Sequence, residues 1–126
     1  MTKWARSGVL DDGLNDIRNN ATRMLLVSAY SAGDSYATVL ANRLAEAAMT
    51  SADFTLGTSG SNRTLTTASG KTAVATAAAT GTPDLHLVFC TASAVVWATD
   101  ETTNVAVAIS DTINFPSVVY TAQQPT

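Results

Sequence analysis

Residues 85–98 read Leu-His-Leu-Val-Phe-Cys-Thr-Ala-Ser-Ala-Val-Val-Trp-Ala, two alternating apolar stretches separated by a short polar break. Alternation with a period of two is typical of β-strands, because successive side chains point to opposite faces. Similar short stretches, separated by polar turns, recur from Asp53 onward, and this pattern predicts an antiparallel β-sandwich or barrel-like domain. The expected strands lie at 54–56, 64–66, 72–76, 85–90, 95–98, 105–109 and 113–120, the last placed at a sheet edge or bulge by Pro116.

The N-terminal segment has a helical pattern instead. Four apolar residues follow the spacing of one helical face, which predicts a short helix over residues 10–20. They are Leu10, Leu14, Ile17 and Ala21. Asp11 and Asp12 then lie in the first turn, where the helix dipole stabilises carboxylates. We therefore attribute these two acids to the helix start.

Two segments complete the first half of the chain. Residues 23–30 hold an apolar run followed by a turn-like composition, which predicts a buried strand. Residues 36–49 fit a helical face, and their alanines favour a helix. Because the surrounding segments are short strands, we expect an extended segment there, with the helix as the alternative.

The 126 residues are expected to form a single domain, 1–126, with a core that needs neither disulfide nor metal. Residues 1–8 are predicted to form an N-terminal arm and residues 122–126 a C-terminal tail. In the arm, Trp4 stands between Lys3 and Arg6. Trp and Arg dominate binding hot spots, so Lys3, Trp4 and Arg6 are the predicted interface residues.

Composition excludes several classes of protein. Ala, Thr and Ser make up 53 of the 126 residues, while charged residues are only 13%, about half the usual share. Two Glu and two Lys are too few for a coiled coil, and the 46% share of hydrophobic residues argues against disorder. No apolar run is long enough for a membrane span. The lone Cys90 excludes an internal disulfide, and the chain start lacks the apolar core of a signal peptide, so we expect folding in a cytoplasm.

Charge is distributed unevenly along the chain. Residues 1–71 hold all seven basic residues and six acidic ones, whereas residues 72–126 hold four acidic residues and no base. The bases are interleaved with acids and form no dense basic patch. We therefore predict no direct binding of nucleic acid.

The sequence holds few candidates for reactive groups. Ser69–Thr72 resembles the end of a phosphate-binding loop, but Leu65 stands where that loop needs glycine, so we expect a turn. His86 and Cys90 lie about 13 Å apart on a strand, too far for a nucleophile and its base. His86 also lacks clustered carboxylates for a metal site; we expect it to face solvent or a neighbouring subunit, and Cys90 to pack as a small hydrophobe.

The acids of the C-terminal half are the remaining candidates for chemistry. Residues 100–104, beginning with Asp100 and Glu101, read as a solvated hairpin turn, and Asp111 has no predicted partner for paired-carboxylate chemistry. Trp97 beside these acids is interpreted as a core residue. The sequence therefore predicts no catalytic, cofactor-binding or metal-binding residue and a protein that is not an enzyme.

The order of segments along the chain resembles a family. The segments are Met1–Trp4, a short helix, Tyr30–Val39, Thr50–Leu56, Arg63–Thr66, Pro83–Val88 and Ala98–Thr102. Together they are similar to the small virion proteins of tailed bacteriophages, in particular capsid decoration (cement) proteins. None of these segments is a chemical signature. The likeness lies in the order of the segments and in their general composition.

The resemblance implies a β-rich subunit made in the bacterial host cytoplasm and located on the capsid surface of the virion. Its expected partner is the major capsid protein, and it joins neighbouring capsomers, often as a homo-oligomer, with a trimer favoured. No cofactor, nucleic acid or membrane is implied. The alternatives are a tail, collar or fibre component of the virion, a non-viral β-sandwich binding module, and a small enzyme.

Overall fold

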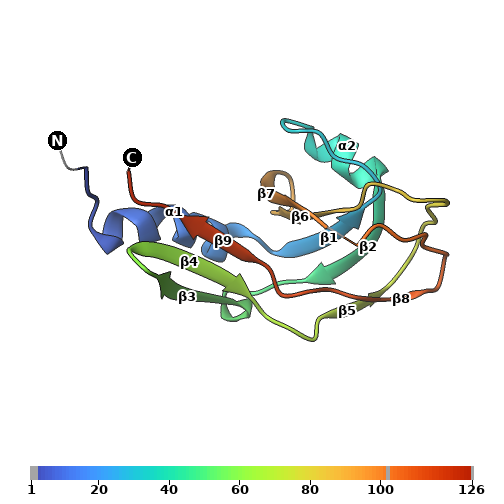
Figure 1. The fold of residues 1–126 in the computed structure, drawn as a ribbon. Helices are drawn as coiled ribbons and strands as arrows, with labels where there is room; N and C mark the ends of the chain where they lie inside the picture. Colours follow the sequence, from blue (N-terminus) through green and yellow to red (C-terminus); the bar gives the residue numbers. More distant parts are fainter. Residues whose placement is uncertain (1–2, 102, 126) are drawn as a thin grey trace.

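The computed structural model describes residues 3–101 and 103–125, and its regular structure is mainly β (Figure 1). The elements in chain order are α1 (Ser7–Asn20), β1 (Arg23–Val27), α2 (Tyr36–Ala41), β2 (Arg43–Ala48), the 3-10 helix η1 (Ser51–Asp53), β3 (Phe54–Ser59), β4 (Asn62–Thr67), β5 (Thr72–Val74), β6 (His86–Cys90), β7 (Val95–Asp100), β8 (Thr112–Asn114) and β9 (Val119–Ala122). The strands form antiparallel sheets in the orders β2-β1-β6-β7, β3-β4-β9 and β5-β8. The predicted mainly β, antiparallel fold with an N-terminal helix is confirmed.

The four-stranded sheet is buried on both faces at its two inner strands, β1 and β6. Alternate side chains of these strands enter two separate clusters. Met24, Leu26, Leu87 and Phe89 enter the main core, and Leu25, Val27, Val88 and Cys90 enter a smaller cluster with Val39 of α2. Burial on both faces explains why nearly every residue of β1 and β6 is apolar: in these two strands the alternation is between two buried faces and not between core and solvent.

The main core joins all three sheets to α1. Leu14 and Ile17 of the helix share it with Phe54 and Leu65 of the three-stranded sheet and with Phe115, which follows β8. Figure 1 shows the result, an elongated molecule in which α1, β3, β4, β9 and both ends of the chain gather at one end. The helix α2 and the sheet β5-β8 lie toward the other end.

A row of aromatic rings connects this core to the surface. The rings of Phe89 and Trp97 stack with centroids 4.6 Å apart, and Trp97 meets the exposed Tyr120 edge-on at 5.4 Å. On the inner side, Phe89 meets Phe54 at 6.0 Å. Trp97 is half-buried against the main core, in agreement with its predicted packing role.

Helix α1 begins earlier than the apolar spacing predicts. It starts at Ser7, so residues 7–8 belong to the helix rather than to an arm, and no acidic residue lies in the first turn. The attribution of Asp11 and Asp12 to the helix start is therefore wrong. Asp11 instead pairs with Arg63 of β4.

Residues 36–49 divide into two elements, so an extended segment throughout is wrong. The Ser35 side chain accepts a hydrogen bond from the Thr38 backbone N–H at 3.2 Å, which caps the short helix α2. After Asn42 the chain pairs with β1 as the strand β2 despite its alanines. Cross-strand pairing and burial outweigh helix propensity there.

Most of the other predicted strands are found where expected but differ in extent, and two predictions are wrong. The expected strand 23–30 ends at Val27, and β3 and β4 are longer than expected because their turn is only Gly60 and Ser61. Residues 105–109 form a single bridge, Val107 with Ala79, rather than a strand. The predicted strand 113–120 is two strands in different sheets, with Pro116 between them.

Candidate functional site

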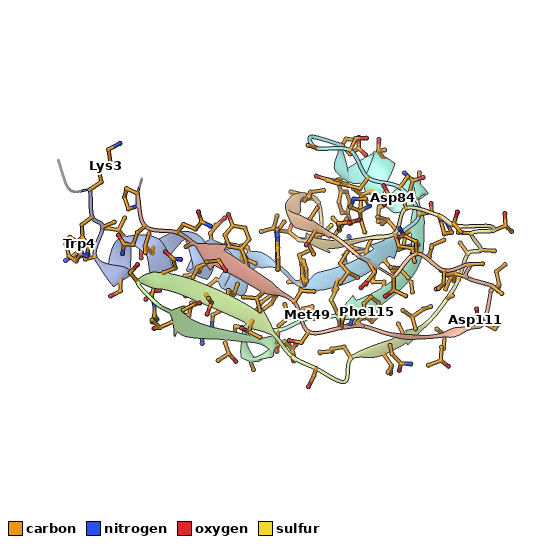
Figure 2. All side chains as sticks on the ribbon, viewed as in Figure 1. Lys3, Trp4, Met49, Asp84, Asp111 and Phe115 are labelled. Carbon is orange, nitrogen blue, oxygen red and sulfur yellow. The ribbon has the colours of Figure 1, made fainter. Side chains whose placement is uncertain are left out.

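The three predicted interface residues all lie on the surface immediately before or at the start of α1. Lys3, Trp4 and Arg6 are exposed, and 72% of the Trp4 surface is open to solvent. Figure 2 shows Lys3 and Trp4 at the end of the molecule away from Asp84 and Asp111. A large aromatic side chain that is exposed to solvent at the end of a molecule is typical of a binding anchor.

The arm is held in place by the C-terminal tail. The Ala5 N–H donates to Gln124 Oε1 and Gln124 Nε2 donates to the Ala5 carbonyl, both at 2.9 Å. Gln124 also donates from its backbone to Asn62 Oδ1 and from Nε2 to the Ser61 carbonyl. The first residue of the tail predicted at 122–126, Ala122, is thus the last residue of β9. Gln124 is held against the molecule by these hydrogen bonds. Residues 1–2 and 126 lie outside the described residues.

This clamp places the backbone beside Trp4 in one position while its ring stays exposed. An anchor whose backbone is already ordered loses less conformational freedom when it binds. The sequence predicted the anchor but not the clamp, because a single Gln 119 residues away from Ala5 gives no local signal.

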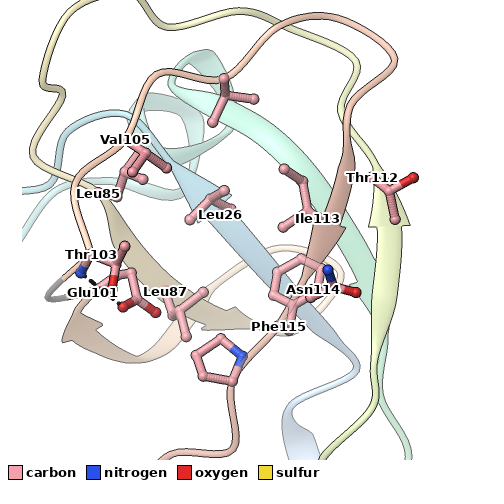
Figure 3. Close-up of a pocket in the computed structure, with 12 residues that line it drawn as sticks. Leu26, Leu85, Leu87, Glu101, Thr103, Val105, Thr112, Ile113, Asn114 and Phe115 are labelled. Atoms are coloured by element: carbon pink, nitrogen blue, oxygen red, sulfur yellow. Dashed lines mark hydrogen bonds between the residues drawn. The ribbon is translucent and has the colours of Figure 1, made fainter.

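The second candidate site is an apolar pocket of about 350 Å³ on the other half of the molecule (Figure 3). Its walls come from β1, from β6 and the residue before it, from the segment after β7, and from β8 and the two residues after it. The apolar lining residues are Leu26, Leu85, Leu87, Val105, Val107, Ile113, Phe115 and Pro116; the polar ones are Glu101, Thr103, Thr112 and Asn114. The volume is at the lower end of the range for small-ligand sites.

Glu101 is the charged group of this pocket. Its backbone N–H donates to the Leu85 carbonyl at 2.9 Å, and its Oε1 accepts from the Thr103 N–H at 3.1 Å. Asp100 is the last residue of β7. Among the described residues β7 pairs only with the preceding strand β6, so the prediction of a hairpin turn at 100–104 is wrong. Thr102 lies outside the described residues. The sequence did not indicate the pocket because its walls come from four separate segments.

His86 lies in a group of possible metal ligands. Ligand atoms of Asp84, His86 and Asp100 all lie within 4.8 Å of one another, with His86 Nε2 3.6 Å from Asp100 Oδ1. The His86 side chain is only 15% exposed and its ring packs beside Tyr30 at 5.9 Å. The expectation that His86 lacks nearby carboxylates is therefore wrong, because strand pairing places Asp100 directly opposite it. Its side chain is also mostly covered rather than open to solvent, while the alternative that it faces a neighbouring subunit stays a prediction.

The other residues considered for chemistry have structural environments. Cys90 is fully buried in the smaller cluster, as predicted, and burial raises the pKa of its thiol. Residues 68–71 connect β4 to β5 with a bend at Ser69 and with Gly70 at a φ of +79°. Lys71 Nζ lies 3.0 Å from Asp53 Oδ2 and donates to the Ala48 carbonyl, which joins this turn to η1 and β2.

Comparisons of the chain with protein-family models, with curated proteins and with solved structures give no match. Across residues 3–101 and 103–125, no helix has the length and apolar character needed to cross a bilayer.

Proposed function

We propose that this protein is a structural component of a tailed-bacteriophage virion, binding the outer surface of the assembled capsid and stabilising contacts between capsomers. The observation that carries the proposal is the arm: an exposed Trp4 beside basic residues, on a backbone clamped by Gln124. Such an arm extends the reach of a small domain beyond its own surface and adds buried area when the domain joins an assembly.

Composition supports the same role. Ala, Thr and Ser give the domain many small side chains and few charges, which permits close approach between copies or between subunit and shell. Further exposed apolar residues lie on the described surface outside the arm. They are Val9, Val74, Val105, Ile109, Val119 and Tyr120. A protein that acts by adhesion to a larger assembly has a use for such a surface.

The first experiment is the copy number of this protein in purified particles of its source, measured by quantitative mass spectrometry against the most abundant shell protein. Decoration predicts one copy per shell subunit or a simple fraction of it. A few copies per particle would assign the protein to the tail or collar. Absence from particles would overturn both virion roles and leave the non-viral binding module.

The second experiment tests the arm. Shells that lack the protein are incubated with the parent chain, with Trp4→Ala and, as a control, with Val74→Ala, which changes another exposed apolar residue, on β5. We expect Trp4→Ala to weaken cosedimentation with shells by about 30-fold, the effect of losing a hot-spot residue. Equal binding by all three chains would contradict the role of the arm.

A further inference from the structure

The arm and the pocket occupy different halves of an elongated molecule. In Figure 2, Trp4 lies at one end, whereas Phe115, a pocket-lining residue, lies in the other half. The hydrogen bonds between Ala5 and Gln124 hold the arm at its own end. Trp4 therefore cannot fill the pocket of its own chain, and any ring that enters this pocket through an arm must come from another molecule.

We propose that the pocket receives the Trp4 side chain of a second copy of this chain, so that neighbouring copies associate through arm and pocket. The inference rests on the proposed function, which brings several copies together, and it names the partner of the arm. The pocket suits this occupant in size and lining: about 350 Å³ with walls of Leu, Val, Ile, Phe and Pro. An indole is a large apolar body with one polar atom.

A polar group of the pocket matches the remaining need of the ring. A buried indole N–H requires an acceptor. Glu101 lines the pocket, and its carboxylate can accept. Figure 3 shows the Glu101 side chain among the apolar residues of the pocket wall.

The charges of the arm and of the pocket surroundings favour Trp4 of a second copy over an unrelated apolar side chain as the occupant. Residues 72–126, which include most of the pocket and its surroundings, carry Asp84, Asp100, Glu101 and Asp111 and no Lys or Arg. The arm carries Arg6 two residues from Trp4. When Trp4 of one copy enters the pocket of another, Arg6 is brought toward an acidic surface, and opposite charges favour this pairing over contact between two pockets.

The test is the concentration dependence of the sedimentation of the purified full-length chain in the absence of shells. We expect the parent chain and Val74→Ala to self-associate with the same dissociation constant. Trp4→Ala is expected to raise that constant about 30-fold. Circular dichroism confirms that each variant is folded, and Trp4 is exposed enough for its removal to leave the core intact.

Charge exchange provides the second variant pair. Arg6→Glu and Glu101→Arg are each expected to weaken self-association, and the chain that carries both changes is expected to recover most of it. A mixture of Trp4→Ala with Glu101→Arg should form one-to-one pairs and nothing larger, because only one intact arm and one intact pocket remain between them.

Several results would overturn the inference: a parent chain that stays monomeric at every concentration, self-association that Trp4→Ala leaves unchanged, or a double charge exchange that restores nothing. Its failure is separable from failure of the proposed function. Shell binding that needs Trp4 without any self-association would refute the inference alone. Self-association through arm and pocket in a protein absent from particles would refute the virion role alone.

Discussion

Asp11 of α1 and Arg63 of β4 form a two-point ion pair, with Nε–Oδ1 at 2.7 Å and Nη2–Oδ2 at 3.3 Å. Both side chains are about four-fifths covered, and Arg63 also donates to the Thr58 hydroxyl. Asp12, the next residue along the helix, is exposed. Two adjacent acids thus have different roles, and helical register alone decides which one joins the helix to the sheet.

Replacement of Asp11 by Ala is expected to lower the free energy of unfolding by about 1–2 kcal/mol, because Arg63 loses both charge-assisted hydrogen bonds in a partly buried site. The matched change Asp12→Ala is expected to stay within about 0.5 kcal/mol of the parent. Urea unfolding of the three chains measures the difference. Equal losses from both substitutions would show that the ion pair contributes nothing specific.

Asp53 forms a second local junction. Burial raises its pKa, but the Thr50 backbone N–H and the nearby Lys71 ammonium outweigh that effect and hold the pKa of Asp53 below its ordinary value of 3.8. The carboxylate accepts from the Thr50 N–H at 2.8 Å and thereby caps η1. Because the unfolded chain takes up the proton first, this stabilisation is complete above pH 3.8 and is lost as the pH falls through the lowered pKa of the folded state.

Asp53→Asn is therefore expected to flatten the decline of the unfolding free energy with falling pH, and Lys71→Met is expected to flatten it partly. Thermal unfolding of the parent and both variants, recorded at several pH values on either side of 3.8, tests this. An unchanged slope in Asp53→Asn would contradict the assignment.

At the scale of elements, residues 36–49 show where sequence patterns stop being decisive. The Ser35 cap and the apolar spacing after it agree with the six-residue helix α2, whereas Arg43–Ala48 becomes a strand through its pairing with β1. Glu46 accepts from both Arg23 and Arg43, at 3.1 and 2.9 Å, which fixes a charged group on a strand of small residues. The spacing of residues within 36–49 indicates neither that β1 is the partner strand nor that Arg23 pairs with Glu46.

The clamp between the two ends of the chain is the other element-scale feature. Gln124→Ala removes both hydrogen bonds to Ala5, so we expect the Ala5 amide to exchange with solvent up to about tenfold faster, the effect of a lost hydrogen bond. Gln123→Ala, at the neighbouring exposed position, is the control and should leave exchange unchanged. Amide exchange followed by NMR decides the matter; protection of Ala5 that survives Gln124→Ala would mean that the arm is held by other contacts.

At the scale of the whole molecule, two apolar clusters lie on opposite faces of one sheet, and the main one links α1 to all three sheets. The row of rings from Phe54 through Phe89 and Trp97 to Tyr120 runs from this core to the surface. The arm and the pocket lie on different halves of the molecule. Separation of the two sites makes an association between copies possible without any change of fold.

The sequence by itself determined the fold class of this protein. Alternation predicts the positions of the strands β3–β7 closely, and the helical spacing predicts α1. The exposure of Trp4 follows from its place in a segment without periodicity. These are local properties of side chains and their spacing. Only the tertiary structure decided that Asp11 pairs with Arg63, that His86 faces Asp100, that Gln124 clamps the arm and that four segments enclose a pocket. Each of those contacts joins residues distant in sequence or opposite in a sheet, so its geometry depends on strand register and packing, which single-residue patterns do not specify.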